Sequence, residues 1–73
     1  MGQHDVTDDI VYDLVSIQYH ALQAVNSYDQ YLEDAKRLDD DELSAFIEEC
    51  RQQDVARARR CHELLGPLTT SSS

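Results

Sequence analysis

The sequence predicts an all-α fold in which two helices form a tight antiparallel hairpin, and this hairpin is expected to dimerise into a four-helix bundle. Apolar residues recur at alternating steps of four and three along the first half of the chain, the spacing of packed helices. Only a short acidic run separates the two halves, and a short connection requires antiparallel neighbours. The chain has 73 residues. A lone core of that size rarely supplies more than about 3–5 kcal/mol, so association is expected.

The first helix is predicted over about residues 7–37, after a mostly polar and flexible N-terminus at 1–6. Thr7 is a good N-cap, and Asp8 and Asp9 suit the positive end of the helix dipole. The apolar positions that follow are Ile10, Leu14, Ile17, Ala21, Ala24, Tyr28, Tyr31, Ala35 and Leu38.

The second helix is predicted over about residues 40–65. Asp39 and Glu42, three residues apart, are expected to form a capping box at its start. A glycine and a proline follow residue 65, and this pair is typical of a helix end. The hairpin domain is thus expected to cover 7–65, with a disordered tail at 66–73.

The apolar face of the first helix is wider than one neighbour requires. One stripe comprises Ile10, Leu14, Ile17, Ala21, Tyr28, Leu32 and Ala35, and a second stripe comprises Val11, Val15, Leu22 and Val25. Together they span about 180°, against about 100° for a simple surface helix. One stripe is expected to face the second helix, and the other a second copy or another protein. The predicted interface residues are Ile10, Val11, Leu14, Val15, Ile17, Leu22, Val25, Tyr28, Leu32, Phe46, Ile47, Cys50 and Cys61.

Polar residues interrupt these apolar faces. Asp54 lies at the centre of the second helix's apolar arc, Arg57 lies near its edge, and Gln18 lies between the two stripes. If the chain reverses near residue 39, Asp54 is level with Val25 and about one turn from Tyr28. We interpret Gln18, Tyr28, Asp54 and Arg57 as an interior polar cluster that fixes register and partner choice. A metal-binding or catalytic role for the Asp54 carboxylate is the alternative.

The charge excludes some partners. The chain carries 15 Asp+Glu against six Lys+Arg, a net charge of −9. Nucleic acid and anionic membrane surfaces are therefore not expected as partners. No apolar run is long enough to cross a membrane, and the N-terminus lacks a signal-peptide pattern, so a cytoplasmic location is expected. Cys50 and Cys61, about 16 Å apart on one helix, are expected to be reduced thiols, although a bridge between chains stays open.

Two long helices, an acidic balance and inward carboxylates resemble half of a ferritin-like four-helix bundle over residues 7–65. The resemblance implies a metal site between two hairpins, holding iron, manganese or zinc. The family's Glu-x-x-His motif is absent. Three positions after Glu33, Glu42, Glu48 and Glu49, where the motif requires histidine, the chain has Lys36, Ala45, Arg51 and Gln52. The substitute ligands would be His20, Glu49 and Asp54.

No nucleophile with a placed base and no glycine-rich phosphate loop is visible, so enzymatic activity and a cofactor are not expected. The expected function is that of a small acidic, non-enzymatic module for self-association or protein interaction. The first alternative is the ferritin-like metal-binding dimer. The second is an acidic regulatory protein that binds a basic protein partner, which only the charge supports.

Overall fold

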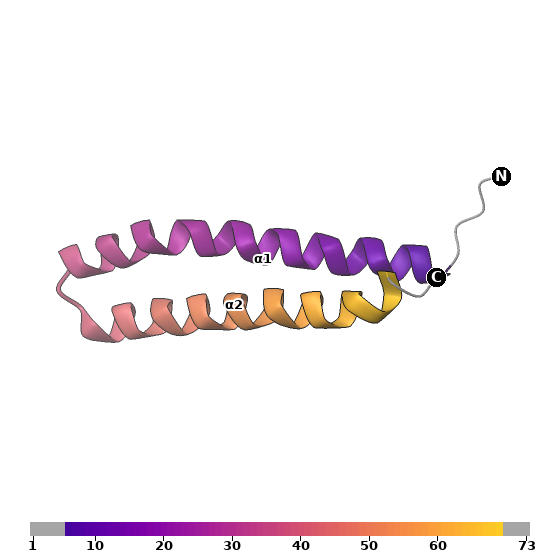
Figure 1. Ribbon diagram of the computed structural model, residues 1–73. Helices are drawn as coiled ribbons and strands as arrows, with labels where there is room; N and C mark the ends of the chain where they lie inside the picture. Colours follow the sequence, from indigo (N-terminus) through magenta and orange to yellow (C-terminus); the bar gives the residue numbers. More distant parts are fainter. Residues whose placement is uncertain (1–5, 70–73) are drawn as a thin grey trace.

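Two long helices make up the described structure. A computed structural model describes residues 6–69, with α1 at Val6–Arg37 and α2 at Asp41–Thr69. The helices contain 32 and 29 residues and run antiparallel, side by side (Figure 1). Residues 6–69 contain no strand. The predicted all-α helical hairpin is therefore confirmed.

The charged side chains at the two ends of α1 match the helix dipole. The helix begins at Val6, with Asp8 and Asp9 in its first turn. Lys36 and Arg37 lie in its last turn, where positive charge is favoured. Of the predicted flexible N-terminus, residues 1–5 lie outside the described residues.

The turn differs from the predicted capping box in which Asp39 caps α2. Asp39 has a left-handed backbone with a φ of 55°, and its amide donates to the Lys36 carbonyl at 2.9 Å. This residue therefore ends α1. The cap of α2 is Asp40, whose Oδ1 accepts a hydrogen bond from the Leu43 amide at 3.1 Å. Because a capping residue needs a non-helical backbone of the extended type, the cap falls to the next acidic residue.

The end of α2 also differs from the prediction. The helix continues through Pro67 to Thr69, so the predicted end at residue 65 is too early. Proline removes only one amide donor, and near a helix end that loss is small. The Thr69 hydroxyl donates to the carbonyls of Leu65 at 2.9 Å and Gly66 at 3.3 Å, which satisfies two backbone oxygens of this turn. The rest of the predicted tail, residues 70–73, lies outside the described residues.

A line of residues at seven-residue spacing brings the helices together. We call it the contact line: Leu14, Ala21, Tyr28 and Ala35 on α1, and Ile47, Asp54 and Cys61 on α2. Its small members are the most enclosed, with Ala21 and Ala35 each 4% exposed and Cys61 5% exposed. Small side chains let two helices approach closely, and the neighbouring Ala58 is likewise buried.

The hairpin does not enclose a core of large side chains. Ala21, Ala35, Ala58 and Cys61 are the buried hydrophobic residues, and no large side chain is fully buried among residues 6–69. The radius of gyration is 16.9 Å. A compact chain of this length would have about 11 Å. The molecule is a rod one layer thick, and most of its apolar side chains keep contact with solvent.

Candidate functional site

A polar cluster lies near the middle of the hairpin, between α1 and α2. The Tyr28 hydroxyl donates a hydrogen bond to Asp54 Oδ2 at 2.7 Å. Arg57, one turn further along α2, donates from Nη1 to Asp54 Oδ1 and forms an ion pair with it. Asp54 is 13% exposed and Arg57 is 50% exposed. A nearly buried carboxylate thus has both oxygens satisfied, one by each helix.

Tyr28 is the residue whose acidity this contact changes. Its hydrogen bond to Asp54, aided by desolvation and by the Asp54 charge, raises the pKa of Tyr28 to about 12. Ionising the phenol would remove the donor and place a second negative charge beside the carboxylate. Tyr28 therefore acts as a neutral hydrogen-bond donor, which suits a structural contact. The Tyr31 ring packs edge-to-face on Tyr28, with ring centroids 5.5 Å apart.

Three of the four residues predicted for the polar cluster come together, and Gln18 lies apart. Its side-chain amide donates a long hydrogen bond of 3.5 Å to the Ala58 carbonyl. Ala58 lies just over one helical turn after Asp54 on α2. Sequence periodicity places Gln18 between the two apolar stripes, and in the structure its side chain is half-buried. Periodicity could not assign its partner, because backbone carbonyls are available at every position of a helix.

The predicted metal ligands are not assembled within the hairpin. His20 is exposed, and its Nδ1 lies 2.8 Å from the Ser16 carbonyl on the same helix. Glu49 is exposed, whereas Asp54 is held by Tyr28 and Arg57. Residues 6–69 contain no group of three His, Cys, Asp or Glu side chains placed to hold a metal ion. Neither helix in this range is long and apolar enough to cross a membrane.

No family model, no curated protein and no solved structure matches the chain.

The apolar arc of α1 is covered differently from the prediction that one whole stripe would face α2. The helix α2 covers the middle of the arc, so Leu14 of one stripe and Val25 of the other are both half-buried. The two edges stay exposed, with Ile17 on one side and Leu22 on the other. One neighbouring helix covers only about 100° of an arc that spans about 180°, and contact at the centre leaves both edges open.

The predicted interface residues accordingly fall into three groups. Cys61 is buried inside the hairpin, so it does not reach its surface. The half-buried residues are Val11, Leu14, Val25, Tyr28, Leu32, Ile47 and Cys50. The exposed residues are Ile10, Val15, Ile17, Leu22 and Phe46.

Equal offsets from the contact line define the two broad faces of the hairpin. Around the helix axis, a residue three positions after the contact line is turned by about 300°, which equals about 60° in the reverse sense. A residue one position after it is turned by about 100°. The two sets of residues therefore lie on opposite sides of the contact line. Two antiparallel helices are related by a two-fold axis perpendicular to their common plane. Residues at the same offset on α1 and α2 therefore lie on the same face.

The first face carries the residues three positions after the contact line and those that continue the same row at seven-residue spacing, with Phe46 at its edge. Its exposed apolar side chains are Ile10, Ile17, Tyr31 and Leu38 of α1, and Leu43, Phe46 and Leu64 of α2. Tyr31, Leu38, Leu43 and Leu64 are not among the interface residues predicted from the sequence. On each helix, however, their spacing is a multiple of seven residues. Arg57 is the charged residue in this row on α2, and it remains paired with Asp54.

Proposed function

We propose that the protein is a non-enzymatic, self-associating helical module whose hairpin pairs with a second copy through the first face, forming a four-helix bundle. The exposed apolar row on this face carries the proposal. It runs along both helices from Ile10 to the turn at Leu38 and Leu43. Contiguous exposed apolar surface of this kind is typical of an interaction site rather than of a stable monomer surface.

Folding energetics support the same proposal. Two rods side by side enclose only small residues, whereas a four-helix bundle buries an apolar face of each helix. Burying a large apolar side chain completely contributes about 1.5–3 kcal/mol. The half-exposed side chains of the first face would contribute part of this from each copy. A symmetric pair uses the same surface on both copies, so the assembly closes at two chains.

The polar cluster gives the proposed interface its selectivity. Arg57 lies on the first face, and it is already neutralised by Asp54 beneath it. Any copy or partner that slides along the face would place a large apolar side chain over this ion pair and leave part of its polar surface unsatisfied. Such interior polar groups are used to fix register and oligomeric state in helical assemblies.

Sedimentation equilibrium over a range of protein concentrations tests the proposal. The wild type is expected to have twice the chain mass at micromolar concentration. Ile17→Glu, on the first face, is expected to shift the equilibrium to monomer or unfolded chain. Leu22→Glu is a matched control, because Leu22 has similar exposure (51% against 44%) but lies on the opposite face. A folded wild-type monomer, or a dimer lost only in Leu22→Glu, would overturn the proposal.

A further inference from the structure

The opposite face of the hairpin has its own exposed apolar row, which the proposed dimer does not use. On α1 this row consists of Tyr12, Val15, Tyr19 and Leu22, at steps of three, four and three. All four side chains are exposed, from 46% for Val15 to 72% for Tyr12. Gln23 donates to the Tyr19 hydroxyl at 3.0 Å, and the His20 ring packs edge-on to Tyr19, so this aromatic side chain is held in place. We call this side of the hairpin the second face.

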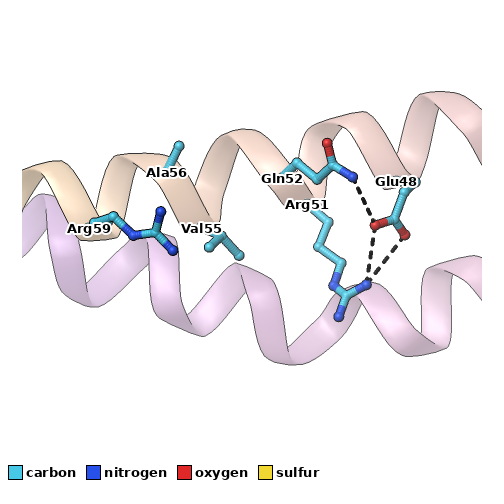
Figure 2. A pocket seen from close by; sticks show the side chains of 6 residues that line it. All are labelled: Glu48, Arg51, Gln52, Val55, Ala56 and Arg59. Carbon is cyan, nitrogen blue, oxygen red and sulfur yellow. Dashed lines mark hydrogen bonds and ion pairs between the residues drawn. The ribbon is translucent and has the colours of Figure 1, made fainter.

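On α2 the second face contains a shallow groove of about 330 Å³. Its lining residues are Glu48, Arg51, Gln52, Val55, Ala56 and Arg59 (Figure 2). Val55 and Ala56 give it an apolar middle, with Val55 39% exposed. Arg51 and Arg59 lie on either side of Val55 along the helix (Figure 2).

The two arginines of the groove differ in their partners. Arg51 pairs with Glu48 at 3.3 Å, and Gln52 donates to the same carboxylate at 3.5 Å. Arg59 is the one arginine of residues 6–69 for which no ion pair is present, since Arg37, Arg51, Arg57 and Arg60 each have a carboxylate partner. In a chain of net charge −9, an unpaired guanidinium beside an apolar groove is an unusual feature.

The α1 row and the α2 groove lie on the same face. Leu22 directly follows Ala21 of the contact line, and Val55 directly follows Asp54. Tyr19 and Arg59 each directly follow a residue of the Gln18–Ala58 hydrogen bond, so they lie at about the same level, toward the two outer edges. Around Leu22 and Val55 the second face is therefore apolar in the middle, with Tyr19 at its α1 edge and Arg51 and Arg59 at its α2 edge. Charged residues lie beyond this stretch, among them Asp8, Asp9 and Asp13 beside Tyr12.

We propose that the second face binds an amphipathic helix of another protein, whose apolar stripe packs on Leu22 and Val55 and whose acidic edge pairs with Arg59 and Arg51. A helix lying between two antiparallel helices is a common mode of peptide recognition, and charge at the rim sets its direction. A second copy fits less well. Two second faces paired about a two-fold axis would bring Arg51 and Arg59 of both copies to one interface, and a first face docked here head-to-tail would give an open chain of subunits.

Fluorescence anisotropy with two synthetic helical peptides tests this proposal. Both peptides have about 18 residues and the same leucine stripe on an alanine background; one carries glutamates along one edge, and the other carries lysines there. The acidic peptide is expected to bind the wild type about tenfold more tightly at low salt, with the preference falling as salt rises. Leu22→Gln is expected to weaken the binding of both peptides.

Charge reversal gives the sharper comparison. Arg59→Glu combined with Arg51→Glu is expected to abolish or invert the preference for the acidic peptide. Arg60→Glu is the matched control, because Arg60 pairs with Glu63 and does not line the groove, and the preference should survive there. Circular dichroism and sedimentation of each variant establish that it is folded and still associated as the wild type is.

Three results would overturn the proposal. They are equal binding of the two peptides to the wild type, no binding of either, and a preference unchanged by the double arginine reversal. A fourth result would also overturn it: the wild type has a mass above that of a dimer, and Leu22→Gln restores the dimer mass. A further copy would then cover the second face. The three peptide results do not depend on whether the first face forms the dimer. If it does not, a wild-type dimer that becomes monomer in Leu22→Gln would overturn the proposal in the same way.

Discussion

The hydroxyl of Tyr28 lies 2.7 Å from Oδ2 of Asp54, and this contact fixes how the two helices of the hairpin meet. It is one of two side-chain hydrogen bonds between α1 and α2 in the described structure, the other running from Gln18 to the Ala58 carbonyl. The two bonds involve different residues of both helices, Gln18 with Ala58 and Tyr28 with Asp54. A shift of either helix by one residue would break both, so polar contacts specify a register that small apolar residues alone would leave loose.

The first prediction concerns the ionisation of Tyr28. Its pKa of about 12, against an ordinary value of 10.0, means that it should titrate later than an ordinary tyrosine. Because the folded-state pKa is raised, the stabilisation is present below pH 10 and is lost as the pH rises toward 12. Tyrosinate absorbance against pH should show one late component, and the melting temperature should fall in the same range.

Tyr28→Phe is the control for this titration. The late component should disappear. If the late component persists in Tyr28→Phe, or shifts in Tyr12→Phe instead, the assignment to the Asp54 contact is wrong.

The second prediction concerns the ion pair itself. Arg57→Leu leaves the Asp54 carboxylate without one of its donors, and should lower the free energy of unfolding by about 1–3 kcal/mol. Replacing Arg57 and Asp54 by Leu together with Tyr28→Phe removes the whole cluster, and stability should return to the wild-type value or exceed it. Denaturant unfolding at fixed protein concentration measures both.

The triple variant also separates stability from selectivity. Its mass distribution is expected to become heterogeneous, because a purely apolar surface no longer distinguishes registers or partners. A triple variant that is both as stable and as uniformly assembled as the wild type would show that the cluster has no role in selection.

Much of this fold follows from periodicity, because the step pattern of apolar residues is a direct consequence of helix geometry. The same reasoning predicts that Asp54 lies within about one turn of Tyr28, since a short turn allows few registers between the helices. It failed where the outcome depends on backbone detail. Whether Asp39 or Asp40 caps α2 depends on which residue takes the left-handed conformation, and both are aspartates.

The division of the apolar arc could not be read from the sequence either. Two stripes of similar hydrophobicity compete for one neighbour, and the closest approach is decided by small residues such as Ala21, Ala58 and Cys61. These contribute little to a hydrophobic pattern but allow the helix axes to come together. The exposed edges of the arc, which carry both proposed interaction surfaces, follow from that choice.

The third prediction tests this close approach. Ala21→Leu should separate the helices near Cys61 and lower the free energy of unfolding by about 1–3 kcal/mol, because an overpacked site must shift its backbone. Ala45→Leu, an exposed alanine on α2, is the control and should change stability by less than about 0.5 kcal/mol. Equal effects of the two substitutions would contradict the contact line.

The last prediction concerns the turn. Asp40→Ala removes the side-chain oxygen that accepts from the Leu43 amide, and should cost about 1 kcal/mol. Asp39→Gly should act in the opposite direction, because glycine adopts a φ of 55° without the steric cost of a side chain. Thermal unfolding followed by circular dichroism would rank the variants as Asp39→Gly above wild type above Asp40→Ala. The reverse order would mean that Asp39 caps α2, as the sequence alone had suggested.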